Sequence, residues 1–362
     1  MKKTARVAAL IGAAALTLAG CGDRGTATES TDTPAESTSS SSSAPAQSNP
    51  DFKACMVSDS GGFNDKSFNQ TSHDGLVQAK TDLGITTAEV ESQSDSEYAD
   101  NIDALVQQNC NSITTVGFLL GEATEKSAKA NPDIDYSIVD FAYDKPAKNL
   151  KGLVFNTAEP SYLAGYLAAG MSKTGTVGTF GGLNIPTVTS FMTGYVQGVE
   201  KFNEDNDADV QVVGWDPKTQ KGSFTEDFED KTKGLTVGQN MIQQGVDVIF
   251  PVAGPAGLGG LQAAQDNDAY AIWVDTDGCE SAAEFCDTLL TSVVKGMDVA
   301  VEQAITDSLE GKFTNEPYVG TLANDGVGIA PYHDLDAEVP QDLKDKVEEL
   351  KQQIISGELK VG

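Results

Sequence analysis

The chain has 362 residues, and its 24 lysine and arginine residues stand against 54 aspartate and glutamate residues, which gives a formal net charge of −30 at pH 7. A surface this acidic repels nucleic acid and anionic lipid, and it favours solubility. The length is sufficient for two lobes, each with a hydrophobic core of its own.

The N-terminus predicts export. Cations at positions 2, 3 and 6 precede an apolar stretch at residues 7–18, which is the layout of a signal peptide and too short for a stable membrane span. Residues 18–21, Leu-Ala-Gly-Cys, resemble the bacterial lipobox, whose cysteine is acylated. We therefore expect a signal peptide at residues 1–20 and a lipid anchor on Cys21. An ordinary signal peptide with a chance cysteine at the cut is the alternative.

A tether is expected between this anchor and the folded part. Residues 21–52 are rich in serine and threonine and include an unbroken run of serine at residues 39–43. Such a segment has too little apolar surface to offset its ordering entropy. We expect it to be a flexible spacer that lifts the folded part off the membrane.

Four further cysteines allow three disulfide pairings in an oxidising compartment. Cys279 and Cys286 are close in sequence, so a local bridge between them is the first choice. Cys55 opens the first expected strand and Cys110 precedes a later one, so these two are a second candidate pair across a sheet. A metal site is not expected, because the chain has no Cys-x-x-Cys motif and only two histidines.

From residue 53 onward, short apolar strands alternate with helical patterns. In chain order, we expect strands at residues 55–57, 87–91, 112–116, 135–139 and 153–155, and helices at about 68–83 and 96–108. This βαβ series predicts a parallel sheet with helices on both faces.

The series then starts again. We expect helices at residues 162–171, 188–202, 228–243 and 258–265, and strands at residues 176–180, 210–215, 246–252 and 269–274. Two successive α/β units without a linker between them predict two lobes that face a common cleft. In open α/β sheets, ligands bind beyond the carboxyl ends of the strands. The order of the elements after residue 293 cannot be read from the periodicity.

Residues 58–70, Ser-Asp-Ser-Gly-Gly-Phe-Asn-Asp-Lys-Ser-Phe-Asn-Gln, follow a strand and open a helix. Asp59 could supply a carboxylate acceptor, Phe68 a stacking face and Asn69 an amide. A flat heterocycle with hydrogen-bonding edges requires these groups. A capped turn with Phe68 in the core explains the same residues equally well.

A second glycine-rich segment lies at residues 254–260, Gly-Pro-Ala-Gly-Leu-Gly-Gly. It follows a strand and precedes a helix, as a dinucleotide-binding loop does. It lacks both the Gly-Lys-Ser/Thr ending of a P-loop and the Gly-x-Gly-x-x-Gly spacing. We do not expect it to bind a nucleotide.

The motif at residues 59–69 closely resembles the start of the mature domain in the basic membrane protein family, also called the PnrA-like purine nucleoside-binding lipoproteins of ABC transporters. That family opens with a very similar Asp-x-Gly-Gly-x-x-Asp-x-Ser-Phe-Asn. Further blocks follow in the family's order, at residues 116–118, 160–169, 185–195, 247–254, 274–277 and 291–295. The ordered set is far more specific than any single block.

The resemblance implies a type I periplasmic-binding-protein fold, with two Rossmann-like α/β lobes around a ligand cleft. We expect residues 53–157, with about 293–322, to form the first lobe. Residues 158–292, with about 323–362, are expected to form the second.

The resemblance also implies eight ligand-binding residues: Asp59, Asn69 and Asp140 for the edge of the base, Phe68 and Phe191 for its two faces, Asp275 and Lys295 for the ribose hydroxyls, and Gly254 for a close backbone approach. A vicinal diol offers donors and acceptors, which suits a carboxylate beside an ammonium. Without the family context, Asp275 would be read as part of a solvated turn and Lys295 as a surface lysine.

The implied function is the extracytoplasmic capture component of an ABC importer, held at the cell membrane by lipid. It would close on adenosine, guanosine or inosine and deliver it to a permease driven by a cytoplasmic ATPase. No catalysis, cofactor or nucleic-acid partner is expected. A sugar receptor of the same fold is one alternative. An extracellular nucleoside hydrolase is another, although Asp59 and Asp65 stand apart, unlike the clustered aspartates of such enzymes.

Overall fold

The computed structural model describes residues 48–362. The predicted signal peptide, the predicted lipid anchor at Cys21 and most of the predicted tether lie outside these residues. None of the helices in the described part of the chain combines the length and apolar character that crossing a membrane requires.

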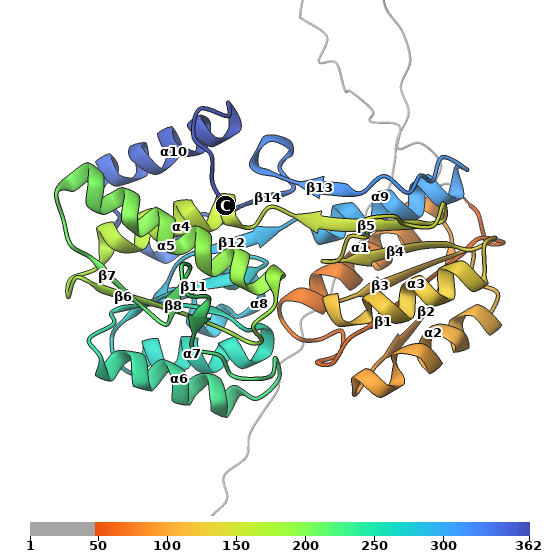
Figure 1. Cartoon of the computed structure of the whole chain (residues 1–362), viewed down its shortest axis with the longest axis horizontal. Coiled ribbons are helices and arrows are strands. Elements are labelled where there is room, and N and C mark those ends of the chain that lie inside the picture. The colour runs from red at the N-terminus through yellow and green to blue at the C-terminus, as the bar shows by residue number, and fades with distance from the viewer. Residues whose placement is uncertain (1–47) are drawn as a thin grey trace, which may run out of the picture. The chain divides into compact units, whose positions relative to one another are not determined.

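Two six-stranded sheets form the framework (Figure 1). The first has the order β13-β5-β4-β3-β1-β2, with bounds Tyr318–Gly320, Leu150–Phe155, Asp135–Val139, Ser112–Val116, Lys53–Ser58 and Thr86–Glu91. The second has the order β14-β12-β11-β10-β6-β7, with bounds Val327–Ile329, Leu289–Lys295, Tyr270–Asp275, Val248–Val252, Thr176–Gly181 and Gln211–Val213. All neighbouring strands in these sheets run parallel except β14, which is antiparallel to β12. The predicted α/β class with parallel sheets is confirmed.

Helices cover both faces of each sheet, and we call each sheet with its helices a lobe. On the first lobe the helices are α1 (Phe68–Leu83), α2 (Tyr98–Gln107), α3 (Gly121–Ala130) and α9 (Met297–Leu309). On the second they are α4 (Ala158–Met171), α5 (Pro186–Asn206), α6 (Lys231–Gln243), α7 (Gly254–Gln265), α8 (Gly278–Ser281) and α10 (Gln341–Ile355). Helix α4 is buried along almost its whole length, because the second sheet, α5 and α10 surround it. This explains why its sequence is apolar on every side.

The last part of the chain passes between the lobes more than once. Strand β12 belongs to the second sheet through Lys295, whereas the sequence placed the return to the first lobe near residue 293. Helix α9 then packs against α1, and β13 pairs with β5 of the first sheet. The chain returns with β14 to the second sheet, and α10 ends on α4.

Two local expectations are wrong. The strand expected at residues 210–215 is divided at Gly214, whose φ of 96° breaks the extended backbone between β7 and the short hairpin of β8 (Trp215–Asp216) and β9 (Lys221–Gly222). The helix expected at residues 258–265 begins four residues earlier, so the whole glycine-rich segment lies within α7, which begins at Gly254. A Cβ at Gly259 would collide with the backbone of α6, so this glycine allows two helices to pack closely.

Both candidate disulfides are formed. Cys55 in β1 bonds Cys110 just before the neighbouring strand β3, with their Cα atoms 6.0 Å apart. Cys279 bonds Cys286, with Cα atoms 4.7 Å apart, and closes the loop that follows β11. Each bridge therefore joins segments that the fold already holds side by side.

The Cys279–Cys286 bridge should add only modest stability. Replacing both cysteines by serine should lower the free energy of unfolding by about 2 kcal/mol, because the closed loop is short and the loss of chain entropy is small. Chemical denaturation of the variant and wild type measures this difference. Peptide mapping of the secreted protein without reduction checks the pairing itself. Four thiols open to alkylation in the native protein would contradict both bridges.

Candidate functional site

A cavity lies where the carboxyl ends of both sets of parallel strands meet. It contains about 630 Å³ of space free of atoms, part of it open to solvent. All eight residues expected from the sequence line it: Asp59, Phe68, Asn69, Asp140, Phe191, Gly254, Asp275 and Lys295. The structure thus brings together side chains that are far apart in the sequence; Asp59 and Lys295 are separated by 236 positions.

The strand ends explain why these residues converge. In the first lobe, Asp59 directly follows β1 and Asp140 directly follows β4. In the second, Asp275 and Lys295 are the last residues of β11 and β12, and Gly254 lies two residues after β10. Side chains at the carboxyl ends of parallel strands share one edge of a sheet. Two such edges facing each other therefore concentrate polar groups in one place.

Two of the cavity aspartates have an unusual backbone. Asp140 has a φ of 64° and Asp275 a φ of 70°, in the left-handed region that side chains other than glycine, asparagine and aspartate seldom adopt. Such residues cost of order 1–3 kcal/mol each and cluster at ligand sites, where the surrounding structure holds them. Gly254 has a φ of 51°, which a glycine adopts without strain.

Lys295 links the two lobes at the bottom of the cavity. Its Nζ lies 2.7 Å from Asp140 Oδ2 in the first lobe and 3.3 Å from Asp275 Oδ1 in the second. The lysine is only 3% exposed. Burial alone would lower the pKa of Lys295, but the two carboxylates outweigh it and hold the pKa above its usual value. The side chain is therefore an ammonium ion at neutral pH, in contact with the carboxyl groups of Asp140 and Asp275.

Aromatic rings surround this ammonium. Its Nζ is 4.5 Å from the ring centroid of Phe68 and 5.5 Å from that of Phe191. A cation over an aromatic face is attracted by the ring's quadrupole. Phe191 itself is 3% exposed and packs toward Phe250 with ring centroids 6.3 Å apart. Phe68 is the more open of the two rings.

The edge of the cavity in the first lobe is an aspartate–asparagine pair. Asn69 Nδ2 donates to Asp59 Oδ1 at 2.9 Å. A side chain on Gly117 would collide with the Asp59 carboxyl, so glycine is required beside it. Burial raises the pKa of Asp59 to about 8, and the nearby carboxyls of Asp65 and Asp140 add to the effect. Asp59 therefore presents a neutral carboxyl group, which can donate as well as accept, over most of the pH range below 8.

The raised pKa of Asp59 predicts a pH dependence of stability. Between the ordinary value of 3.8 and about 8, the folded protein binds more protons than the unfolded chain. This contribution to stability is therefore full below 3.8, falls as the pH rises across that range, and is gone above about 8. Asparagine cannot ionise. For the ligand-free proteins, we expect the melting temperature of Asp59→Asn minus that of wild type to increase as the pH is raised from about 5 to about 9.

Differential scanning fluorimetry across that range measures the difference between the two proteins. Asp133→Asn, which removes the same charge from an exposed position, is the control for the general effect of lowering the net charge. Parallel curves for wild type and Asp59→Asn would contradict the assignment.

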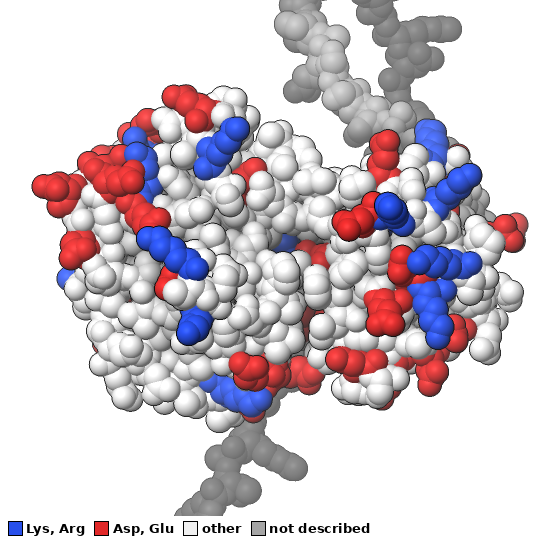
Figure 2. All heavy atoms as spheres, viewed as in Figure 1, with Lys and Arg blue, Asp and Glu red and all other residues white. Residues whose placement is uncertain are grey.

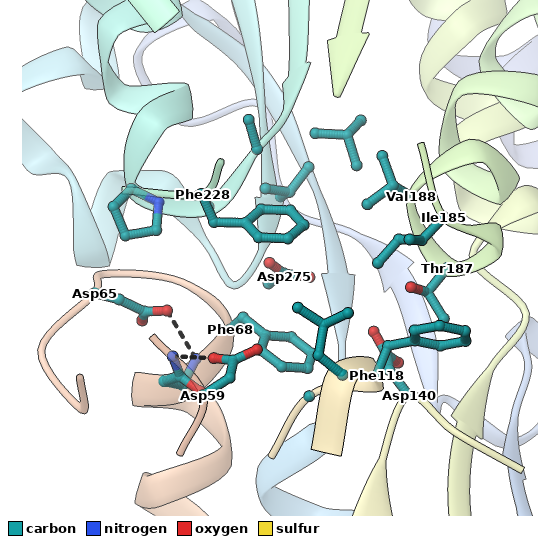
Figure 3. A pocket seen from close by; sticks show the side chains of 18 of the residues that line it. Asp59, Asp65, Phe68, Phe118, Asp140, Ile185, Thr187, Val188, Phe228 and Asp275 are labelled. Atoms are coloured by element: carbon teal, nitrogen blue, oxygen red, sulfur yellow. Dashed lines mark hydrogen bonds between the residues drawn. The ribbon is translucent and has the colours of Figure 1, made fainter. Parts of the chain in front are cut away.

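Several cavity residues were missed in the sequence. Phe118, Ile185, Thr187, Val188 and Phe228 also line the space. Figure 3 shows Phe228, from the second lobe, on the opposite side of the space from Phe68 of the first. Phe118 and residues 185–188 lie within the recognised sequence blocks and could have been proposed from them. Phe228 follows an irregular segment and carried no such signal.

A possible metal-binding group lies near the cavity but is not complete. Among the described residues, Asp277, Cys279 and His333 bring ligand atoms within 4.8 Å of one another. The Cys279 sulfur is bonded to Cys286 and is not a thiolate. His333 Nε2 lies 2.7 Å from Asp277 Oδ2, so this pair fastens the loop after β11 to the C-terminal segment.

Comparisons with known proteins find relatives that match most of the chain. The profile of a family described as "ABC transporter substrate-binding protein PnrA-like" matches residues 52–362. The "CD4+ T-cell-stimulating antigen" of Listeria monocytogenes is 31% identical over 334 residues, which cover 87% of this chain and 89% of that protein. The "ABC transporter nucleoside-binding protein BmpA" of Lactococcus lactis is 32% identical, with coverage of 86% and 89%. A crystal structure of a solute-binding protein of an ABC transporter system from Aeropyrum pernix superposes with a TM-score of 0.75 and 29% identity, and covers 85% of this chain and 92% of that one.

Proposed function

Because the chain belongs to the PnrA-like substrate-binding proteins of ABC transporters, we propose that it captures a purine nucleoside in the cavity between its lobes and delivers it to a membrane permease. The observation that carries the proposal is the composition of the cavity. Aromatic rings line it together with an aspartate–asparagine pair at one edge and a carboxylate–ammonium pair at the other.

The base fits the side of the first lobe. Phe68 supplies a stacking face, and Phe228 faces it across the space (Figure 3). Phe228 takes the place expected for Phe191, whose ring is buried near Phe250 and Lys295. Stacking of a base on an aromatic side chain contributes about 1–3 kcal/mol. Asp59, as a neutral carboxyl, offers a donor and an acceptor to the polar edge of the heterocycle.

The ribose fits the bottom of the cavity. Asp275 can accept hydrogen bonds from a vicinal diol, and Lys295 can donate to it. A phosphate group does not suit this site. Asp59, Asp65, Asp140 and Asp275 all line the cavity, and Lys295 already lies beside two of these carboxyls. The proposed ligand is therefore the nucleoside and not the nucleotide.

The name of the Lactococcus lactis relative as a nucleoside-binding protein supports the same ligand class. A permease and an ATPase are the partners that an ABC importer requires. The net charge of −30 disfavours nucleic acid as a partner. Figure 2 shows acidic side chains spread over the viewed face of the described residues, with basic ones interspersed.

Isothermal titration calorimetry with a matched ligand panel tests the proposal. Adenosine, guanosine and inosine should bind with one site per chain, and AMP, ribose and glucose should not. Binding of a monosaccharide without any nucleoside would make the protein a sugar receptor of the same fold. Incubation with inosine followed by chromatography should return inosine unchanged, and release of free base would indicate a hydrolase.

We also propose that Cys21 carries lipid and that the segment after it tethers the folded part to the membrane. The expected tether ends before residue 49, because Asn49 hydrogen-bonds the main chain of Leu83 and Gly84 in the first lobe. Cys21→Ser should release the protein from the membrane fraction into the medium, or leave the signal peptide uncleaved, because acyl chains on the cysteine supply the attachment. Immunoblots of membrane and medium fractions measure this. A mature variant that stays bound to the membrane would contradict the lipid anchor.

A further inference from the structure

Lys66 and Ser67, two consecutive residues of the first lobe, contact side chains of the second lobe. Neither belongs to the eight expected ligand-binding residues. Ser67 Oγ donates to Asp275 Oδ2 at 2.7 Å in a buried position. Lys66 Nζ lies 2.8 Å from Glu284 Oε1 at the surface. The indole Nε1 of Trp273 donates to the main-chain oxygen of Lys66 at 3.4 Å. Three polar contacts between the lobes therefore meet at one turn.

The turn that carries Lys66 and Ser67 is held firmly in the first lobe. The Asp65 carboxylate accepts hydrogen bonds from the backbone N–H groups of Ser67, Asn69 and Gln70, at 2.9, 2.9 and 3.0 Å. Lys66 has a φ of 62°, an uncommon conformation for lysine. A residue in such a conformation persists only where its surroundings fix it.

The receiving segment of the second lobe is also fixed. Asp275 ends β11, and Glu284 lies a few residues later within the loop that Cys279 and Cys286 close. Asp277 accepts the backbone N–H of Cys279 at the start of α8, and its other oxygen contacts His333. The segment that carries both receiving carboxylates is thus held by the end of β11, by the disulfide and by the contacts of Asp277.

The buried contact extends the network at the bottom of the cavity. Asp140, Lys295, Asp275 and Ser67 form a chain of contacts of 2.7, 3.3 and 2.7 Å. The chain begins and ends in the first lobe and passes through two residues of the second. Ser67 therefore fixes one oxygen of Asp275 from the opposite side of the cleft, while Lys295 lies beside the other.

We propose that Lys66 and Ser67 are positioning residues that set the affinity for ligand: they hold the lobes together around the cavity and orient the Asp275 carboxylate, and so slow the release of the nucleoside. This inference rests on the function proposed above. Because the apparent dissociation constant rises as the binding-competent arrangement becomes less populated, weakening either contact should weaken binding without removing any group that touches the ligand.

A charge exchange tests the surface contact. Lys66→Glu and Glu284→Lys should each raise the dissociation rate constant of the nucleoside by about 2- to 5-fold, since an exposed ion pair is replaced by like charges. The double variant Lys66→Glu with Glu284→Lys should return to within about 2-fold of wild type. Lys129→Glu makes the same charge change in the first lobe, in an ion pair confined to α3, and should have no effect.

Ser67→Ala tests the buried contact. We expect the dissociation rate constant to rise about 10-fold, because a hydrogen bond to a charged group is lost, while the association rate constant changes little. Ser72→Ala is the control, since Ser72 is equally buried on α1 but its hydroxyl donates within the helix, to the Phe68 carbonyl. Stopped-flow fluorescence can follow both rates, because Trp273 contacts the turn itself.

Two failures can be told apart. Nucleoside release at the wild-type rate from all three single variants, Lys66→Glu, Glu284→Lys and Ser67→Ala, would overturn the role of the turn and leave the proposed function intact. If wild-type protein binds no nucleoside, the proposed function fails. Hydrogen exchange of the ligand-free protein then tests whether the turn with Lys66 and Ser67 holds the lobes together. Faster exchange at residues 276–288 in Lys66→Glu than in Lys129→Glu would support the contact between the lobes, and equal exchange would refute it.

Discussion

Replacing Lys295 by methionine should lower the free energy of unfolding by about 3–5 kcal/mol, because it removes one partner of a buried ion network and leaves the others without compensation. Asp140 and Asp275 are both less than 10% exposed and contact this ammonium from opposite lobes. Burial already raises the pKa of Asp140 although the lysine is present. Without the cation, the two carboxyls would face each other across the cleft, and nucleoside binding should be lost as well.

Chemical denaturation at neutral pH and calorimetry measure the two effects. Lys151→Met is a matched control, because Lys151 is a buried lysine that pairs with one carboxylate, Asp307, on the surface side of the first lobe. It should destabilise the protein less and leave nucleoside binding unchanged. A Lys295→Met protein as stable as wild type, with undiminished binding, would contradict the role given to the lysine.

Removing the carboxylate of Asp275 should weaken nucleoside binding by about 10- to 150-fold, which corresponds to the loss of a hydrogen bond to a charged group. Asp275 supplies the proposed diol acceptor, and it also holds Ser67 and Lys295 in place. Phe68→Ala removes a stacking face and should cost about 1–3 kcal/mol of binding free energy. The two variants therefore act on different parts of the ligand.

Free purine bases separate these roles. A base has no diol, so its binding should suffer from Phe68→Ala but hardly from Asp275→Ala. Calorimetry of both variants with adenosine, inosine and guanosine and with their bases makes the comparison. Equal losses for base and nucleoside in Asp275→Ala would show that this carboxylate does not recognise the ribose.

The strands could be predicted because they depend on local signals, whereas the eight site residues were implied by the ordered sequence blocks of the resembled family. Apolar runs mark the buried parallel strands, and Asp140 and Asp275 directly end two of them. Helix α3 was not predicted, since the positions it buries are Gly121, Thr124, Ser127 and Ala128, which give no apolar periodicity. Its packing is decided by small residues fitting against the sheet.

Other features depend on contacts between distant segments. The start of α7 was expected at residue 258 instead of Gly254, and only the neighbouring helix α6 shows that the glycines of α7 allow close packing. Phe228 has no motif around it, and it joins the site because the fold brings its side chain to the cavity. The crossing of β12, α9, β13 and β14 between the lobes follows from pairing partners that periodicity does not encode.

Native mass spectrometry of the folded part of the chain, mixed with equal concentrations of adenosine, guanosine, inosine, cytidine, ribose and glucose, tests the central claim most directly. The cavity predicts one bound ligand per chain with the mass of a purine nucleoside, and the same measurement on Asp275→Ala should show this complex strongly reduced. A complex with a monosaccharide in place of the nucleoside, or no complex at all, would contradict the claim.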